Sequence, residues 1–363
     1  MAYAFELDLT GRRMLSMEQR WSRSDTIDVA YRRISEDFGA TWSPPEEYRT
    51  GERRADGMLR RHPRGPWVHP KTGETLECWL EAVLPNDDPL EGLSRWQIMY
   101  RWRGKTAAIP REVLRHTPAM LGDMTCRPIL RADGAILLPV SLSPLRDGKI
   151  YNPGGGYTWH DAAVLVGRIT PSGIDWTMTD VIEGDPSRST RGWPEPAIAT
   201  LAGGRILMVM RGSNDRSLDL PGVKWYAMSN DGGRTWSRPM PWSDTNGGVF
   251  YSPSSCSQLL AHSSGRLFWL GNRTNANPKG NRPRYPMVIS EVNLRTGLVV
   301  AGSERVIDDL APGEDPLLTL SNFYAREDRR TREICLHMTR LFARSDGWEG
   351  DAMLYRIPVS AQG

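Results

Sequence analysis

A short motif, a turn containing glycine followed by an apolar strand, recurs along the whole chain. Five copies have their glycine at Gly11, Gly73, Gly134, Gly204 and Gly265, and a sixth, degenerate copy has Thr331 or Arg332 there. The spacings are 62, 61, 70, 61 and about 67 residues. Glycine accepts the positive φ that a tight hairpin turn requires. Units of this length hold four short strands, so the repeat predicts an all-β, six-bladed β-propeller whose blades are four-stranded antiparallel sheets.

The repeat also predicts the domain organisation. No linker or low-complexity segment interrupts the chain, so residues 1–363 are expected to form a single propeller domain that carries the active site. Hydrophobic residues make up 39% of the chain, which is enough for a large core. Residues 110–121 are the one stretch that is a candidate for a short helix.

Composition narrows the expected partners and compartment. The net charge of +3 is close to neutral and by itself argues neither for nor against a nucleic-acid partner; none is predicted. No apolar run is long enough to span a membrane, and residues 1–13 lack the pattern of a secretory signal, so a cytoplasmic protein or a mature secreted form is expected. No metal or cofactor is predicted. The four cysteines lie in strand-like runs and are expected to be free buried thiols: Cys78, Cys126, Cys256 and Cys335.

Two segments share a stricter pattern, Ser-x-Asp-x-Gly-x-Thr-Trp. They comprise Ser35, Asp37, Gly39, Thr41 and Trp42, and Ser229, Asp231, Gly233, Thr235 and Trp236. Each begins about 25 residues after a repeat glycine, which predicts a turn between the third and fourth strands of a blade. The Ser and Asp side chains can bond to the turn backbone, and Trp fills the space between strands. The pattern resembles the Asp box of sialidases and related BNR-repeat proteins. That resemblance implies the six-bladed fold but not the chemistry, because Asp boxes also occur in propellers that are not enzymes.

Polar residues gather at the positions that would surround one end of the propeller channel, namely the starts of inner strands and the loops after second strands. By repeat, they are Arg20 and Asp25; His62 and Arg64; Tyr157 and His160; Arg191, Glu195 and Arg211; Tyr251, Arg282 and Arg284; and Asn322 and Tyr324. Arginine binds carboxylate through planar bidentate donors, and acids, Tyr or His move protons. Arginine forms 41 of the 46 basic residues, a bias that codon preference in a GC-rich genome also explains. The set predicts an acidic carbohydrate as substrate.

The sialidase resemblance suggests roles for several of these residues. The segment from Glu195 to Arg211 is similar to a family segment in which Glu supports a nucleophilic Tyr and Arg binds the substrate carboxylate. The run from Asn277 is similar to the region of another carboxylate-binding Arg, which makes Arg284 or Arg282 the candidate. Asp25 stands where the family carries its acid/base Asp.

The chain is identified as a divergent member of the sialidase superfamily. Residues 1–9 hold no arginine where the family has its first carboxylate-binding Arg, and Leu320 occupies the register of the nucleophilic Tyr. Tyr251 or Tyr324 is then a spatial replacement. The predicted catalytic residues are Glu195, Asp25, Tyr251, Tyr157, His160 and His62, and the predicted substrate-binding residues are Arg211, Arg284, Arg64, Arg282, Arg191 and Arg20.

Three functions are compatible with this pattern. The first is an exo-acting glycoside hydrolase that cleaves a terminal sialic acid-like sugar or uronate. The second is a polysaccharide lyase or rhamnosidase-type enzyme that acts on uronate-containing chains through His, Tyr and Arg. The third is a carbohydrate-binding propeller without catalytic activity. The sugar, the linkage, the stereochemical outcome and the oligomeric state stay open.

Overall fold

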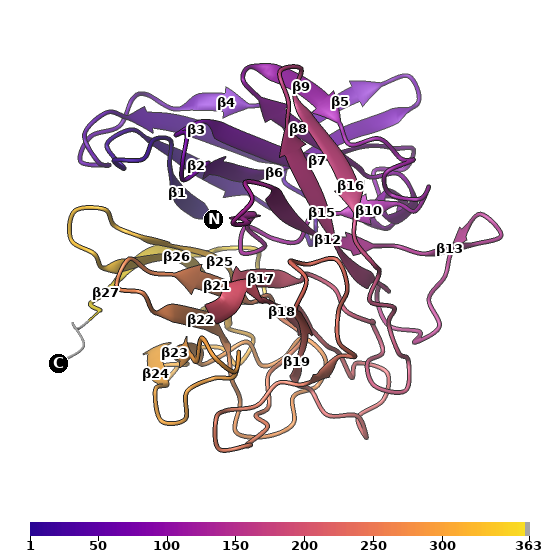
Figure 1. Ribbon diagram of the computed structural model, residues 1–363, viewed down its shortest axis with the longest axis vertical. Coiled ribbons are helices and arrows are strands. Elements are labelled where there is room, and N and C mark those ends of the chain that lie inside the picture. Colours follow the sequence, from indigo (N-terminus) through magenta and orange to yellow (C-terminus); the bar gives the residue numbers. More distant parts are fainter. Residues whose placement is uncertain (360–363) are drawn as a thin grey trace.

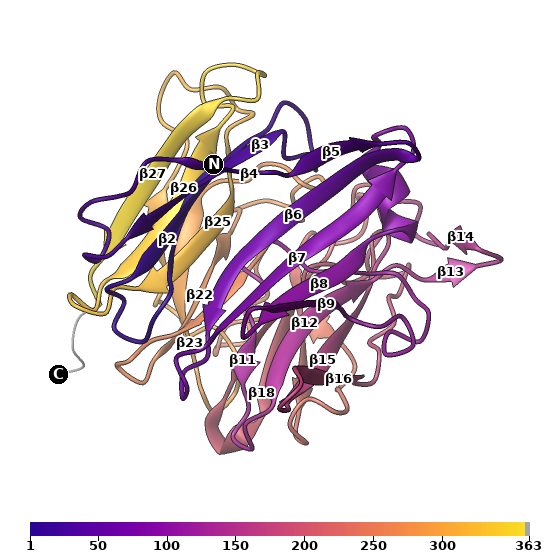
Figure 2. The ribbon, with the colours of Figure 1, turned by 90° about the horizontal axis from the view of Figure 1, so that it is seen from above.

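The computed structural model describes residues 1–359 and forms a six-bladed β-propeller of antiparallel sheets (Figures 1 and 2), which confirms the predicted fold class. Blade 1 holds β1 (Ala2–Glu6), β2 (Met14–Arg20), β3 (Val29–Ser35) and β4 (Glu46–Tyr48). Blade 2 holds β5 (Gly51–Arg54), β6 (Gly57–Val68), β7 (Thr75–Leu84), β8 (Gln97–Trp102) and β9 (Lys105–Ala108). Blade 3 holds β10 (Ala119–Met120), β11 (Ile129–Leu130), β12 (Ile136–Leu142), β15 (Asp161–Ile169) and β16 (Ile174–Met178).

The second half of the chain completes the ring. Blade 4 holds β17 (Ala197–Thr200), β18 (Ile206–Arg211), β19 (Lys224–Ser229) and β20 (Met240–Pro241). Blade 5 holds β21 (Gln258–Ala261), β22 (Leu267–Asn272), β23 (Met287–Val292) and β24 (Arg305–Asp308). Blade 6 holds β25 (Thr319–Glu327), β26 (Ile334–Leu341) and β27 (Gly350–Ile357). The hairpin of β13 (Leu145–Arg146) and β14 (Lys149–Ile150) projects from blade 3. Blades 1, 4 and 5 thus have the expected four strands, whereas blades 2 and 3 have five and blade 6 has three among the described residues.

The six repeat motifs lie in the connections β1–β2, β6–β7, β11–β12, β17–β18, β21–β22 and β25–β26. The five repeat glycines all have positive φ, between +72° and +87°. The sixth copy places Arg332 in the same left-handed conformation, with φ +61°, so the backbone geometry is kept where the glycine is not.

The two Ser-x-Asp-x-Gly-x-Thr-Trp segments lie in the turns between third and fourth strands, β3–β4 and β19–β20, as expected. In the second segment, Ser229 Oγ accepts the Gly233 N–H at 2.8 Å and Asp231 accepts the Thr235 N–H and hydroxyl at 3.0 and 2.7 Å. The first segment has the same contacts through Ser35 and Asp37. These bonds hold the turns on the outer edges of blades 1 and 4.

The core is divided into clusters that each join two neighbouring blades. Strand β18 illustrates the reason, because successive side chains of a strand point to opposite faces of the sheet. Ile206, Met208 and Met210 pack against blade 3, whereas Leu207 and Val209 pack against blade 5. A strand buried on both faces therefore appears in the sequence as a continuous apolar run.

The helix considered for residues 110–121 is not formed. Residues 111–116 form turns, and Arg115 and His116 have φ values of +53° and +62°, which a right-handed helix does not allow. A short 3₁₀ helix occurs instead at Pro89–Ser94, where the Asp88 carboxylate accepts the Leu90 N–H at 2.9 Å. No helix among residues 1–359 is long and apolar enough to cross a membrane.

Substitution of Gly134 tests the backbone requirement of the repeat. This glycine has φ +87°, and an added Cβ would meet no atom within 4 Å, so Gly134→Ala is expected to cost only the strain of the left-handed conformation, about 1–2 kcal/mol. Gly134→Asn is expected to cost less, because Asn adopts this conformation more readily. Equal thermal stability of the two variants and the parent would contradict this assignment.

Candidate active site

A cavity of about 400 Å³ lies at one end of the propeller channel. One part of its wall is mainly polar, and the other part is more apolar. Residues from blades 3 to 5 are mainly polar and include Ser141, Tyr157, His160, Arg191, Glu195, Arg211, Asn281, Arg282 and Arg284. Residues from blades 6, 1 and 2 include a larger apolar share, with Met1, Trp21, Leu90, Leu93, Trp96, Leu341, Phe342 and Trp348. The cavity therefore has a charged side and an apolar side.

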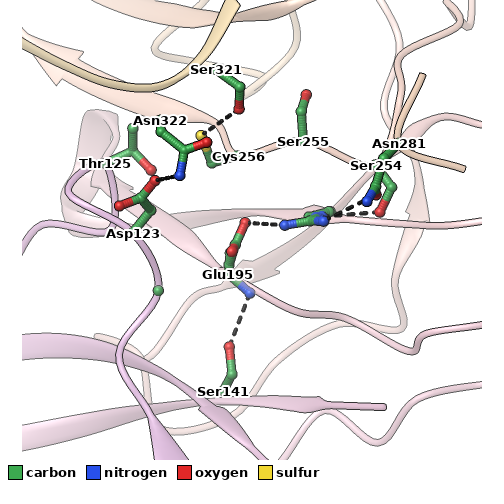
Figure 3. A network of polar contacts seen from close by, with 12 residues as sticks. Asp123, Thr125, Ser141, Glu195, Ser254, Ser255, Cys256, Asn281, Ser321 and Asn322 are labelled. Carbon is green, nitrogen blue, oxygen red and sulfur yellow. Dashed lines mark hydrogen bonds and ion pairs between the residues drawn. The ribbon is translucent and has the colours of Figure 1, made fainter. Parts of the chain in front are cut away.

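An ion pair between Glu195 and Arg211 lies on the charged side (Figure 3). Glu195 lies two residues before β17, and Arg211 ends β18, so the first hairpin of blade 4 brings them together. Arg211 donates to Glu195 Oε2 at 2.6 Å, to Ser254 Oγ at 2.9 Å and to Asn281 Oδ1 at 3.2 Å. Burial would raise the pKa of Glu195, but the charge and hydrogen bond of Arg211, with Arg191 and Arg284, lower it to about 2. Glu195 is thus ionised at neutral pH.

Positive charge exceeds negative charge in this cavity. Five arginines line it, against the three carboxyl groups of Asp25, Asp123 and Glu195. Apart from Arg211, none of these arginines forms an ion pair within the described part of the chain. Burial and then the charge of Arg211 lower the pKa of Arg191 to about 9 and that of Arg284 to about 10. An anion bound beside them would relieve this repulsion.

Asp123 supplies a second carboxyl group next to Glu195. An added Cβ at Gly122 would lie 3.3 Å from the Glu195 Cα, so the two backbone segments run in close contact. Asp123 accepts the Asn322 side-chain amide at 2.8 Å (Figure 3). It also accepts the Met124 N–H at 2.8 Å. Burial raises the pKa of Asp123, and Arg64 offsets this in part. One cavity thus holds an ionised carboxylate and a carboxyl group whose pKa is raised.

Strand irregularities direct several side chains into the cavity. The register of β25 against β26 shifts between Ser321 and Tyr324, and that of β6 against β7 shifts between Pro63 and Pro66, which places Asn322 and Arg64 in β-bulges. Glu195, Asp25 and Asn322 all have left-handed φ values, between +53° and +55°. Such conformations in residues other than glycine cost energy and concentrate at functional sites.

Asp25 and Tyr157 meet at the mouth of the cavity. They come from blade 1 and from the glycine-rich loop of blade 3, and the Tyr157 hydroxyl donates to Asp25 Oδ2 at 3.4 Å. Burial and the Asp25 charge raise the pKa of Tyr157 to about 12, so its hydroxyl is protonated at neutral pH. The Arg191 guanidinium lies 5.6 Å from the centre of the Tyr157 ring.

Both predicted histidines line the cavity, and both are buried. His62 packs on Trp96, with ring centroids 4.8 Å apart, and His160 Nδ1 lies 3.2 Å from Ser143 Oγ. Burial lowers both pKa values to about 3, assisted by Arg64 and Arg191 respectively. They are therefore neutral at pH 7 and weak as bases.

The cavity brings together ten of the twelve residues predicted from the sequence. Tyr251 and Arg20 lie outside it: Tyr251 is exposed and bridges Val223 and Thr274, and Arg20 pairs with Glu18 at the solvent-exposed end of β2. Leu320 is fully buried in the core, and Tyr324 packs on Phe5. Neither lines the cavity, so the structure places no tyrosine at the register of the family's nucleophile.

Sequence reasoning missed Asp123 and did not select Asn322. Asp123 lies between β10 and β11, two short strands that pair with β12 in place of one continuous strand. Such an interruption has no periodic signal in the sequence.

The comparison with protein families agrees with this fold. The sequence profile of the BNR repeat-like domain family matches residues 101–305, more than half of the chain. The chain belongs to the BNR repeat-like domain family. No curated protein sequence matches it.

Solved structures similar to this BNR-repeat protein include several glycosidases. The NanB sialidase of Streptococcus pneumoniae is 12% identical with a TM-score of 0.60, over 97% of this chain and 67% of NanB. The GH93 α-L-arabinofuranosidase of Fusarium graminearum is 13% identical with a TM-score of 0.55, over 98% of this chain and 92% of that enzyme. A Dyadobacter fermentans protein of unknown function is 12% identical with a TM-score of 0.59, over 97% and 92% of the two chains. At such identities the likeness shows a shared fold alone.

The neutral histidines predict a characteristic pH response. Because their folded pKa values lie below the usual 6.5, the unfolded chain binds more protons, and stability falls as the pH drops below about 6.5. Each histidine contributes up to about 1.4 kcal/mol per pH unit. The NMR signals of His62 and His160 are expected to stay those of neutral rings down to about pH 4. Titration of His62 or His160 near pH 6.5 would contradict this interpretation.

Proposed function

We propose that this BNR-repeat protein is an exo-acting glycoside hydrolase that removes a terminal acidic sugar from a glycan. The observation that carries the proposal is the combination in one cavity of the ionised Glu195, the more easily protonated Asp123 and arginines without acidic partners. Carboxyl pairs whose pKa values are driven apart serve as acid and nucleophile, or acid and stabiliser, in glycosidases. The glycosidases among the similar folds support the same reaction class.

In this proposal the two carboxyl groups have different roles, one as proton donor and the other as nucleophile or charge stabiliser. Asp123 donates a proton to the glycosidic oxygen as the C–O bond breaks, and the Glu195 carboxylate attacks or stabilises the developing positive charge at the anomeric carbon. Water then adds to that carbon and returns a proton to Asp123. Asp25, with Tyr157 at the cavity mouth, is the alternative proton donor.

The arginines are the reason for proposing a sugar with a carboxylate as the substrate. Arg191, Arg211 and Arg284 are buried or half-buried on the charged side, where hydrogen bonds to a carboxylate are strong. The opposite wall, with Trp21, Trp348 and other apolar groups, suits the less polar face of a sugar or the group attached to it.

The lyase alternative is less well supported. It requires a base that abstracts a proton from carbon, yet the two cavity histidines have pKa values of about 3 and Tyr157 has one of about 12. At neutral pH the histidines are weak bases and the tyrosine is protonated. Uronate polymers are therefore expected to yield no ultraviolet absorbance from an unsaturated product.

Hydrolysis is tested with aryl sialosides and aryl uronides. The protein is expected to release the aryl alcohol from at least one of them, and Glu195→Gln is expected to lower kcat by about 10³-fold or more. Glu183→Gln, at an exposed glutamate outside the cavity, is the control with unchanged activity. Release from none of the acidic glycosides by the parent protein would reject the proposal.

Carboxylate binding is tested at Arg284. Because a hydrogen bond to a charged group contributes about 1.5–3 kcal/mol, Arg284→Ala is expected to raise KM for the acidic glycoside about 10–100-fold. Arg20→Ala is the matched control, since Arg20 is a surface arginine outside the cavity. Equal KM values for these two variants would argue against Arg284 as a substrate ligand.

A further inference from the structure

Lys224 is a buried cation directly behind the charged side of the cavity. It begins β19 and faces Arg211 in the β18–β19 ladder. Its exposed fraction is 0%, whereas the other four lysines of the chain are exposed. It does not line the cavity, so the proposed reaction gives it no role.

The Lys224 ammonium group is held by neutral acceptors. It donates to the Pro253 carbonyl at 3.0 Å, to Ser255 Oγ at 3.4 Å and to the Ser255 carbonyl. Among residues 1–359 it forms no ion pair with a carboxylate. An ammonium group has three N–H donors, and these three acceptors can satisfy them all. In a chain that otherwise favours arginine, this tetrahedral arrangement suits lysine better than a planar guanidinium.

The segment that Lys224 holds, Pro253–Cys256, is itself part of the site. Ser254 Oγ accepts the Arg211 Nε–H at 2.9 Å, and the Ser254 N–H donates to the Gly280 carbonyl at 2.7 Å. Cys256 lines the cavity, with its Sγ 3.7 Å from Ser321 Oγ (Figure 3). A chain of direct contacts therefore runs from Lys224 through this segment to the Arg211 guanidinium.

We propose that Lys224 is a positioning residue, whose ammonium group fixes the Pro253–Cys256 segment and thereby orients Arg211 to bind the anionic group of the ligand. The proposal rests on the proposed function, because it takes Arg211 as a ligand of the acidic sugar.

The surroundings of Lys224 couple its charge to ligand binding. The charged and titratable groups that face it are Arg211 and Arg284, Glu195 and Cys256. Burial and then Arg211 lower the pKa of Lys224 to about 7, with Glu195 and Cys256 offsetting part of the shift. The ammonium form is therefore lost as the pH rises through about 7. A bound anion next to Arg211 favours the charged form, so binding is accompanied by proton uptake, and by linkage the ligand binds more tightly below pH 7 than above it.

The test measures binding of sialic acid and of glucuronate by calorimetry at pH 6, 7.5 and 8.5, in two buffers of different ionisation enthalpy at each pH. For the parent protein, binding about tenfold tighter at pH 6 than at pH 8.5 is expected, with the largest proton uptake near pH 7.5, which corresponds to a rise of about one in the pKa of Lys224. Lys224→Met is expected to bind about tenfold or more weakly at pH 6 and to lose this pH dependence. Lys279→Met, at an exposed lysine, is the control.

The possible results separate the proposed role of Lys224 from the proposed enzyme activity. Lys224→Met protein that is folded and keeps the parent's affinity and pH dependence overturns the proposal. If Lys224→Met does not fold, the parent protein alone is decisive, because anion binding without proton uptake also overturns it. Anion binding with proton uptake but without hydrolysis of any acidic glycoside rejects the proposed enzyme and leaves the role of Lys224 standing. Binding of neither anion overturns both.

Discussion

The ion pair of Arg211 and Glu195 joins the two ends of the first hairpin of blade 4 inside the cavity. Removing one partner of such a buried pair typically costs about 3–5 kcal/mol, because the other charge is then left without compensation. The pair keeps Glu195 ionised and fixes the Arg211 guanidinium, which also donates to Ser254 and Asn281. The other arginines that line the cavity have no acidic partner among the described residues, so they are free to bind an anion together with Arg211.

The propeller explains how so many charges can gather in one place. Each blade contributes polar or charged side chains at one end of the channel without disturbing the apolar clusters between blades. Where the regular strand geometry would direct a side chain into the core, a bulge redirects it, as for Arg64 in β6 and Asn322 in β25. The scaffold is thus built from regular repeats, and the site is built from departures from them.

This contrast between regular repeats and local irregularities explains which features could be predicted from the sequence. The glycine turns repeat because the backbone needs a left-handed residue in every blade, so the six blades followed from spacing. Spacing and the family resemblance together placed ten predicted residues in the cavity. Bulges leave no such periodic signal. Counting strand positions in blade 6 led to Leu320, which is in the core, while the bulge presents Asn322. Tyr251 was misplaced for a related reason, since it lies in an irregular loop whose path depends on contacts with Val223 and Thr274.

The central claim is that the arginines on the charged side of the cavity and the two carboxyl groups form one site for an acidic sugar. A crystal structure of the protein soaked with sialic acid or glucuronate tests it most directly. The account predicts the sugar carboxylate against Arg211 and Arg284 or Arg191, with the anomeric carbon facing Glu195 and Asp123. A sugar bound outside the cavity, or bound in it with its carboxylate turned away from these arginines, would contradict the account.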